Sequence, residues 1–257
     1  MNQREKEQRA ARRFLILVAF LIVVLIAVIY LLFFRIRDIS LDMAYDKTSS
    51  IFGIGKMTQE NGRAESFASD LCVSGVDVPL EGFEAPAESA ALFNEAEHEV
   101  IYAKELHAKR YPASITKIMT TLVALKYGNL DEMVTVGEEC KNIEFGSSVC
   151  EIHVGDHFTL RQLVYGLMIN SGNDAAMTIA VHIAGSVEKF VEMMNQEAAD
   201  IGASGTHFVN PHGLQDENHY TTAYDIYLMF HEALKYEEFR DIIGQHTYYA
   251  EYTDAAG

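Results

Sequence analysis

The sequence has few cysteines, no internal repeat and few basic residues beyond its first 37 positions. Its three cysteines, Cys72, Cys140 and Cys150, fit neither a zinc-ligand spacing nor a C-x-x-C pair, which argues against a zinc site. The lack of repeats and of low-complexity tracts argues against a solenoid or a biased, disordered chain. What is present is a chain of 257 residues, 49% hydrophobic, which suits one substantial core or two small domains.

Positive charge is scarce, and only one end of the chain has an excess of it. The chain holds 20 Lys and Arg against 37 Asp and Glu, a formal net charge of −17. Residues 1–37 hold seven basic and two acidic residues, a charge of +5, so the remainder carries −22. A body this acidic repels polyanions, and no nucleic-acid partner is expected.

The longest apolar run, "FLILVAFLIVVLIAVIYLLFF", covers residues 14–34 without a charge. As a helix it would be about 30 Å long, the thickness of a hydrocarbon core. Five basic residues precede it and only a poor cleavage site follows it in "RIRDISLDMAY", which favours an uncleaved anchor over a signal peptide. We expect a cytoplasmic N-terminus at 1–13, a single-pass signal-anchor helix at 14–34 and an extracytoplasmic remainder at the cell membrane; a buried core helix is the alternative.

After the anchor, glycines scattered among polar residues predict a stalk over 35–87, followed by the folded domain at 88–257. Short apolar runs around "NEAEHE" predict a hairpin, and helical spacing after Pro112 predicts a buried helix that stops at Gly128. Four more helices are expected at 157–170, 173–185, 186–202 and 221–236, and a strand at 241–253. Cys140 and Cys150 pair in an oxidising exterior or stay reduced in a thiol-rich one, and the sequence leaves both open.

The stretch "YPASITKIMTTLVALKYG" places Ser114 and Lys117 three residues apart at the start of the buried helix. Residues at this spacing share a helix face, so the lysine lies within reach of the hydroxyl. Burial lowers a lysine pKa, which lets the amine act as a base toward a serine nucleophile. The alternative is that Ser114 only caps the helix.

The S-x-x-K spacing also occurs at Ser186 and Lys189, so the spacing alone does not identify a site. There, the flanking glutamates and the preceding Gly185 indicate an ordinary N-cap on a surface helix. Lys117, by contrast, is followed by no charge until Lys126, so it would be an unpaired cation in apolar surroundings. This difference favours Ser114 as the functional serine.

A second polar group occurs at Ser171, Gly172 and Asn173, between two apolar helical segments. Gly172 is expected to allow a tight turn from which the flanking side chains project into a cleft. Ser171 could relay a proton from Lys117, and Asn173 could hold a substrate amide. The alternative is a helix-helix turn with both residues as caps.

Together, "PASITKIMT", "VYGLMINSGNDAA" and the stretch through "NPHGL" resemble the penicillin-binding serine D-alanyl-D-alanine carboxypeptidases of low molecular mass. The resemblance implies an α/β (α+β) domain of the β-lactamase and transpeptidase type, with a helical subdomain and an antiparallel sheet. It implies Ser114 as nucleophile, Lys117 as general base, Ser171 as proton shuttle and Asn173 as substrate ligand. The implied reaction removes the terminal D-alanine of a peptidoglycan pentapeptide through an acyl-enzyme, without a cofactor, and β-lactams would inhibit it by acylating the same serine.

One family element, a Lys-Thr-Gly strand after the second serine, is not found. Lys47-Thr48-Ser49 precedes the nucleophile, and His246-Thr247-Tyr248 places a tyrosine where substrate backbone requires glycine. We therefore expect that the chain is a fragment truncated before this strand.

Two further groups of residues and two rival functions complete the interpretation. His207, His212 and His219 match no standard metal spacing, and no metal is expected. Thr222 and Asp225 are interpreted as a helix cap. A class A β-lactamase would need a glutamate for deacylation, for which Glu192 and Glu197 on a surface helix are poor candidates. A membrane-anchored muropeptide or β-lactam sensor without turnover is the alternative from another class.

Overall fold

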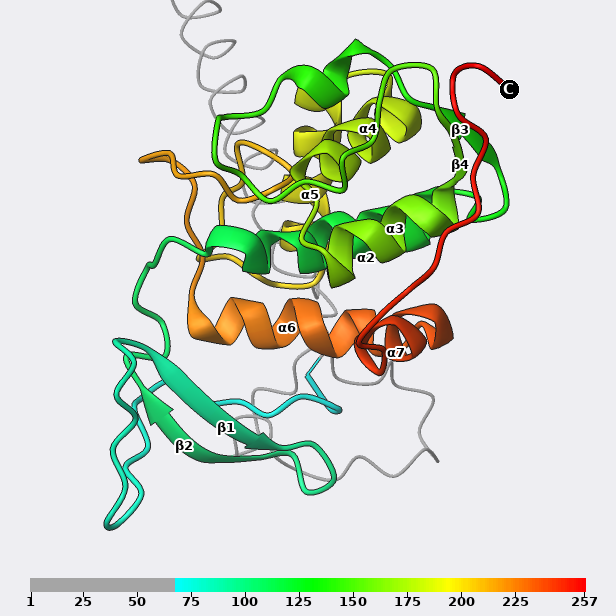
Figure 1. The fold of residues 1–257 in the computed structure, drawn as a ribbon. Helices are drawn as coiled ribbons and strands as arrows, with labels where there is room; N and C mark the ends of the chain where they lie inside the picture. The colour runs from blue at the N-terminus through cyan, green and yellow to red at the C-terminus, as the bar shows by residue number, and fades with distance from the viewer. Residues whose placement is uncertain (1–67) are drawn as a thin grey trace, which may run out of the picture. The chain divides into compact units, whose positions relative to one another are not determined.

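The computed structural model describes residues 68–257 (Figure 1). The anchor predicted at 14–34 lies outside the described residues. Within the described part, no helix is long and apolar enough to cross a membrane.

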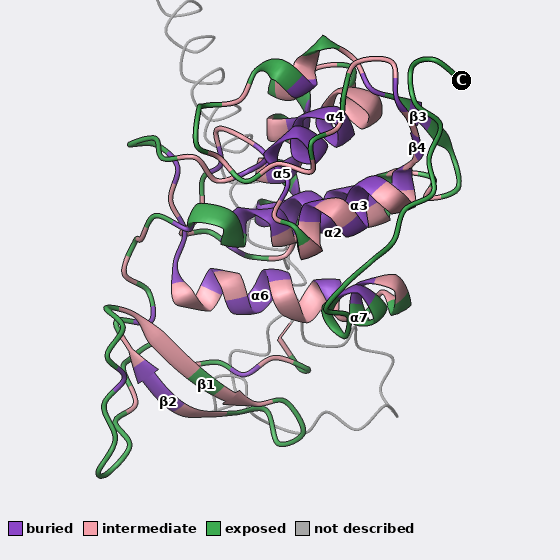
Figure 2. Ribbon diagram, in the orientation of Figure 1, coloured by how far each residue is buried: buried purple, intermediate pink, exposed green. Residues whose placement is uncertain are grey.

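The central element is the helix α2 (Lys117–Tyr127), which packs against four other helices (Figure 1). Its middle, from Met119 to Ala124, is almost fully buried, as Figure 2 shows. The burial follows from the sequence, because apolar residues occupy nearly every face of this helix. The surrounding helices are α3 (Leu160–Ile169), α4 (Asn173–Ala184), α5 (Val187–Asp200) and α6 (Ala223–Ala233), so all five predicted helices are confirmed.

Local capping sets where these helices begin. Thr159 caps the N-terminus of α3 in a capping box: its side chain accepts the Gln162 backbone N–H, and the Gln162 side chain accepts the Thr159 backbone N–H. Ser186 accepts a hydrogen bond from the backbone N–H of Lys189 at 3.3 Å and opens α5, as predicted. Thr222 caps α6 through the N–H of Asp225 at 3.0 Å, which confirms the cap assigned to that pair. The second S-x-x-K spacing is therefore a helix start.

The strands form two small antiparallel sheets. The predicted hairpin is confirmed as β1 (Ala90–Asn94) and β2 (Glu99–Lys104), and its strand β1 lies beside α6 (Figure 1). A second pair, β3 (Met133–Thr135) and β4 (His157–Thr159), was not predicted. Three-residue strands carry too short an alternation to be seen in a sequence. The domain is thus a mixed α and β fold in its described part.

The strand predicted at 241–253 is wrong. The structure places its first residues in the helix α7 (Glu237–Ile243), and the rest runs irregularly along α3, with a single bridge between Thr253 and His157. Tyr248 packs on Tyr165 with ring centres 4.3 Å apart. The preference of aromatic residues for strands depends on packing against neighbouring strands, and here Tyr248 packs on a helix instead.

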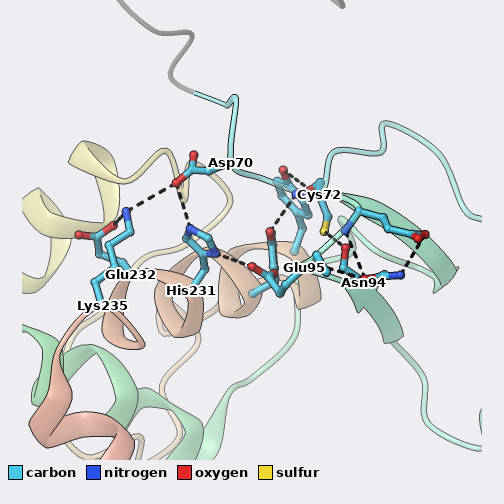
Figure 3. Close-up of polar contacts among 11 residues, drawn as sticks. Asp70, Cys72, Asn94, Glu95, His231, Glu232 and Lys235 are labelled. Atoms are coloured by element: carbon cyan, nitrogen blue, oxygen red, sulfur yellow. Dashed lines mark hydrogen bonds and ion pairs between the residues drawn. The ribbon is translucent and has the colours of Figure 1, made fainter. Parts of the chain in front are cut away.

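The domain also begins earlier than predicted, since residues 68–87 of the expected stalk pack on it. Cys72 is fully buried, its N–H donates to the Tyr227 hydroxyl at 2.8 Å, and its carbonyl accepts from Tyr224 at 3.1 Å. Figure 3 shows this segment over α6, where Asp70 lies 3.3 Å from His231. These contacts could not be predicted from the local sequence, because each is made to a residue about 150 positions away.

All three cysteines are free thiols. Cys72 and Cys140 are buried, and Cys150 is half-buried. Burial raises the pKa of Cys150 to about 12, so this thiol stays protonated.

Candidate active site

Ser114 lies in a 3-10 turn, Ala113–Thr116, that leads directly into α2. Neither this turn nor α2 has a side-chain cap, so Ser114 does not act as one. Its Oγ instead lies 3.3 Å from the Lys117 Nζ and accepts a hydrogen bond from the Ser171 hydroxyl at 3.1 Å. In a 3-10 turn, side chains three residues apart lie one above the other, which places the Ser114 hydroxyl next to the Lys117 amine.

Lys117 is 3% exposed although it is a lysine at the start of a helix. Its Nζ donates to the Asn173 Oδ1 at 2.8 Å and to the His212 carbonyl at 2.9 Å. The prediction of an unpaired lysine is thus refined: the partners are neutral oxygens rather than apolar groups. Burial lowers the pKa of Lys117 to about 8.

The geometry around Nζ suits a base. The Asn173 amide oxygen and the His212 carbonyl can only accept, so each takes one N–H of the amine. A neutral amine has two N–H groups and one lone pair, and the third neighbour of Nζ is the Ser114 hydroxyl. The lone pair of the neutral form therefore faces the hydroxyl proton.

Ser171 and Asn173 sit at the junction of α3 and α4. The left-handed residue of the turn is Ser171, with φ of 56°, whereas Gly172 has an ordinary φ of −66°. Gly172 is needed for space, because a Cβ there would come within 2.3 Å of the Cys150 sulfur. A non-glycine residue at positive φ is strained, and such strain concentrates at functional sites.

The loop 209–219 completes the site, and its part was not predicted residue by residue. Thr120 donates to the Pro211 carbonyl at 2.6 Å, which presents the next carbonyl, that of His212, to Lys117. Asn210 closes the loop by accepting from the Gly213 N–H at 2.7 Å. Gly213 has φ of 90° and passes so close to Ala113 that a Cβ would overlap its carbonyl. The motif "NPHGL" indicated this loop, but it did not predict which carbonyl accepts the hydrogen bond from Lys117.

The histidines of this loop hold backbone and side-chain partners. His212 accepts from the Leu214 N–H at 3.2 Å, and burial, with the nearby Lys117, lowers its pKa to about 4. His207 lies on the exposed side, bonded to the Asn218 carbonyl. No three His, Cys, Asp or Glu side chains of residues 68–257 are grouped to hold a metal.

Glu197, considered above for a β-lactamase, is buried on α5 and paired with Lys126 at 2.7 Å. Tyr127 also donates to it, at 3.2 Å. These partners lie at the C-terminal end of α2, whereas Ser114 precedes its first residue. Glu197 therefore joins α5 to α2 and is not placed to activate a water at Ser114.

Comparison with known proteins identifies the family to which the chain is similar. Residues 76–255 match the family described as D-alanyl-D-alanine carboxypeptidase. The carboxypeptidase DacF of Bacillus subtilis is 38% identical over 172 residues, which are 65% of this chain and 44% of that protein. The DacA carboxypeptidase of Haemophilus influenzae is 40% identical over 124 residues, 46% of this chain and 32% of that protein. The chain thus spans less than half the length of these curated relatives.

Solved structures show the same fold. The Streptomyces K15 DD-transpeptidase superposes with a TM-score of 0.61 at 32% identity, over 66% of this chain and 68% of that one. The carboxypeptidase DacD of Francisella tularensis superposes with a TM-score of 0.56 at 31% identity, over 73% of this chain and 44% of that one.

Proposed function

Because the chain belongs to the D-alanyl-D-alanine carboxypeptidase family, we propose that it removes the terminal D-alanine of peptidoglycan pentapeptides through an acyl-enzyme on Ser114. The observation that carries the proposal is the Ser114 Oγ, which lies 3.3 Å from a buried lysine amine and 3.1 Å from a second hydroxyl. A serine needs such a base to become a nucleophile at neutral pH.

In the proposed reaction, the Ser114 Oγ attacks the carbonyl carbon of the penultimate D-alanine, and Lys117 takes the hydroxyl proton. The C–N bond then breaks, and Ser171 passes the proton from Lys117 to the nitrogen of the departing D-alanine. Water hydrolyses the ester, which releases the shortened peptide and restores the serine. Asn173 orients Lys117 through its amide oxygen, and its side-chain NH₂ group donates to the substrate.

The test is the intact mass of the full chain, purified in detergent, after exposure to benzylpenicillin. We expect one penicilloyl adduct that is lost in Ser114→Ala. Ser186→Ala is the matched control, because it changes the other S-x-x-K serine, which caps α5. An adduct that survives Ser114→Ala, or none on the unsubstituted folded chain, contradicts the acyl-enzyme.

A membrane-anchored protein that binds muropeptides or β-lactams without turnover is the second candidate. Release of D-alanine from a peptide ending in D-Ala-D-Ala, measured on the same preparation, separates the two. A stable adduct without D-alanine release favours binding alone. Rapid hydrolysis of benzylpenicillin would favour a β-lactamase.

We also propose that the chain is anchored in the cell membrane by residues 14–34 with its catalytic domain outside. The support is the uncharged length of this run and the five basic residues before it. Alkaline phosphatase, which is active only outside the cytoplasm, should be active when fused after residue 45 and inactive when fused after residue 13. The reverse pattern would contradict this orientation.

A further inference from the structure

Thr116, one of the two residues between Ser114 and Lys117 in the sequence, is buried, and its hydroxyl faces His219. It is 1% exposed, and its hydroxyl lies 2.8 Å from the Nε2 of His219, which is equally buried. His219 comes 103 residues later and belongs to the loop whose His212 carbonyl meets Lys117. The contact therefore joins the nucleophile turn to the loop on the other side of the amine.

The backbone determines which ring nitrogen of His219 carries the proton. Its Nδ1 accepts the N–H of Val209 at 3.1 Å, so this nitrogen has no hydrogen of its own. Burial lowers the pKa of His219 to about 4, which keeps the ring neutral at physiological pH. A neutral ring that accepts at Nδ1 has its proton on Nε2, so Nε2–H donates to the Thr116 hydroxyl.

The turn that receives this bond has weak backbone hydrogen bonds of its own. A 3-10 turn has weaker hydrogen-bond geometry than an α-helix, and here the Ile115 N–H reaches the Pro112 carbonyl only at 3.2 Å. Ala113 in the same turn has a positive φ of 47°. A shift of about 1 Å in a reacting group costs on the order of 10²-fold in rate, so a turn of this kind needs an anchor.

We propose that His219 is a positioning residue, which holds the Ser114 turn in its reactive geometry by donating from Nε2 to the Thr116 hydroxyl. The inference rests on the proposed function, since it assigns His219 a role in forming the acyl-enzyme. His219 itself touches neither Ser114 nor Lys117 and acts through Thr116.

The test measures the second-order rate of acylation by a fluorescent penicillin, with the melting temperature of each variant alongside. Thr116→Val removes the acceptor at nearly constant volume, and His219→Ala removes the donor. We expect each to slow acylation about 10- to 100-fold. Thr116→Ser, which keeps a hydroxyl, and His219→Gln, which offers an amide N–H near the Nε2 position, should recover most of the rate.

The matched control is His207→Gln, an exposed histidine of the same segment that is bonded only to backbone. It should acylate at the unsubstituted rate. The double variant Thr116→Val with His219→Ala should be no slower than the slower single variant, because both remove one contact. The positioning role would be overturned if the rate losses of the two single variants multiplied in the double variant, or if Thr116→Val acylated at the full rate. It would also be overturned if the acylation rates of the variants followed their melting temperatures, whether or not residue 116 keeps a hydroxyl.

A second readout separates this inference from the proposed function. Long-range ¹⁵N NMR of the unsubstituted full chain should show His219 protonated on Nε2 alone from pH 6 to 8. If that tautomer is present and no adduct forms, the acyl-enzyme is refuted, and the positioning role falls with it. If adduct forms equally in all variants, only the positioning role is refuted.

Discussion

The residue on which the proposed chemistry depends most is Lys117, because its protonation decides whether Ser114 has a base. Burial lowers its pKa to about 8, while the Asn173 and His212 oxygens orient the amine without adding charge. A carboxylate in either position would favour the ammonium form and remove the lone pair. Neutral partners are thus the feature that suits this lysine to its proposed role.

The rate of acylation by benzylpenicillin should rise with pH through about 8 and level off above it, since the deprotonated amine is the active form. At pH 7 the rate should be about a tenth of its plateau, because one pKa unit separates the pH from the midpoint. Stopped-flow measurement between pH 6 and 9.5 checks this. A rate that is flat or falls across this range would show that Lys117 is not the base.

Asn173→Asp should slow acylation at pH 8 by at least about 10-fold and move the midpoint of the profile upward. The new carboxylate would lie about as close to Nζ as the amide oxygen does now, at 2.8 Å, and would stabilise the ammonium. Asn218→Asp makes the same change on an exposed loop and should leave the profile where it is. An unshifted midpoint in Asn173→Asp would contradict the electrostatic account.

At the scale of elements, the start of α4 is strapped to the loop before β4. Asp174 accepts the Cys150 N–H at 2.8 Å and the Ile152 N–H at 3.2 Å, and the Asn173 N–H reaches the Ser148 carbonyl. The loop thereby lies against Gly172, with the Cys150 sulfur where a side chain would be. The packing of this loop therefore leaves no room for a side chain at position 172, between Ser171 and Asn173.

Gly172→Ala should destabilise the fold by about 1–3 kcal/mol, because its Cβ would meet the Cys150 sulfur at 2.3 Å although the backbone angle permits alanine. Adding Cys150→Ala should recover most of the loss. Gly75→Ala, which faces open space, is the control and should change little. Urea unfolding measures all four chains. If Cys150→Ala rescues nothing, the clash is not the cause.

The helices and the hairpin were predictable because their signals are local. Apolar spacing, Gly128 and the Ser186 and Thr222 caps act over three or four neighbouring residues, and tertiary contacts did not override them. The strand expected at 241–253 failed for the complementary reason. Only Thr253 of this stretch pairs with a strand, through its single bridge to His157 of β4, and Tyr248 packs on Tyr165 of α3 instead.

At the scale of the molecule, the packing of the described domain includes residues that the sequence predicted to be a linker. The segment from Asp70 to Cys72 lies over α6, and its backbone satisfies the hydroxyls of Tyr224 and Tyr227 (Figure 3). Farther along, Val78 pairs with Ala103 on β2. Helix α6 is thus covered by the hairpin and by the chain that leads into it.

A chain that begins at residue 66 should fold, whereas one that begins at residue 88, the start expected from the sequence, should lose at least about 3 kcal/mol. The loss follows from exposing the surface that buries Cys72 and Ala85. Urea unfolding followed by tyrosine fluorescence suits this chain, which has no tryptophan. Equal midpoints for the two chains would mean that residues 68–87 add nothing to stability.

By itself the sequence predicted the five helices α2 to α6, the hairpin and four candidate site residues, Ser114, Lys117, Ser171 and Asn173, but not the helix α7. These are local properties, carried by spacing, caps and short motifs. Only the tertiary structure decided that Lys117 meets the His212 carbonyl, that His219 donates to Thr116, and that the segment before residue 88 belongs to the domain. Each of these depends on groups far apart in the chain, whose distance is set by packing and by the need of buried polar atoms for partners.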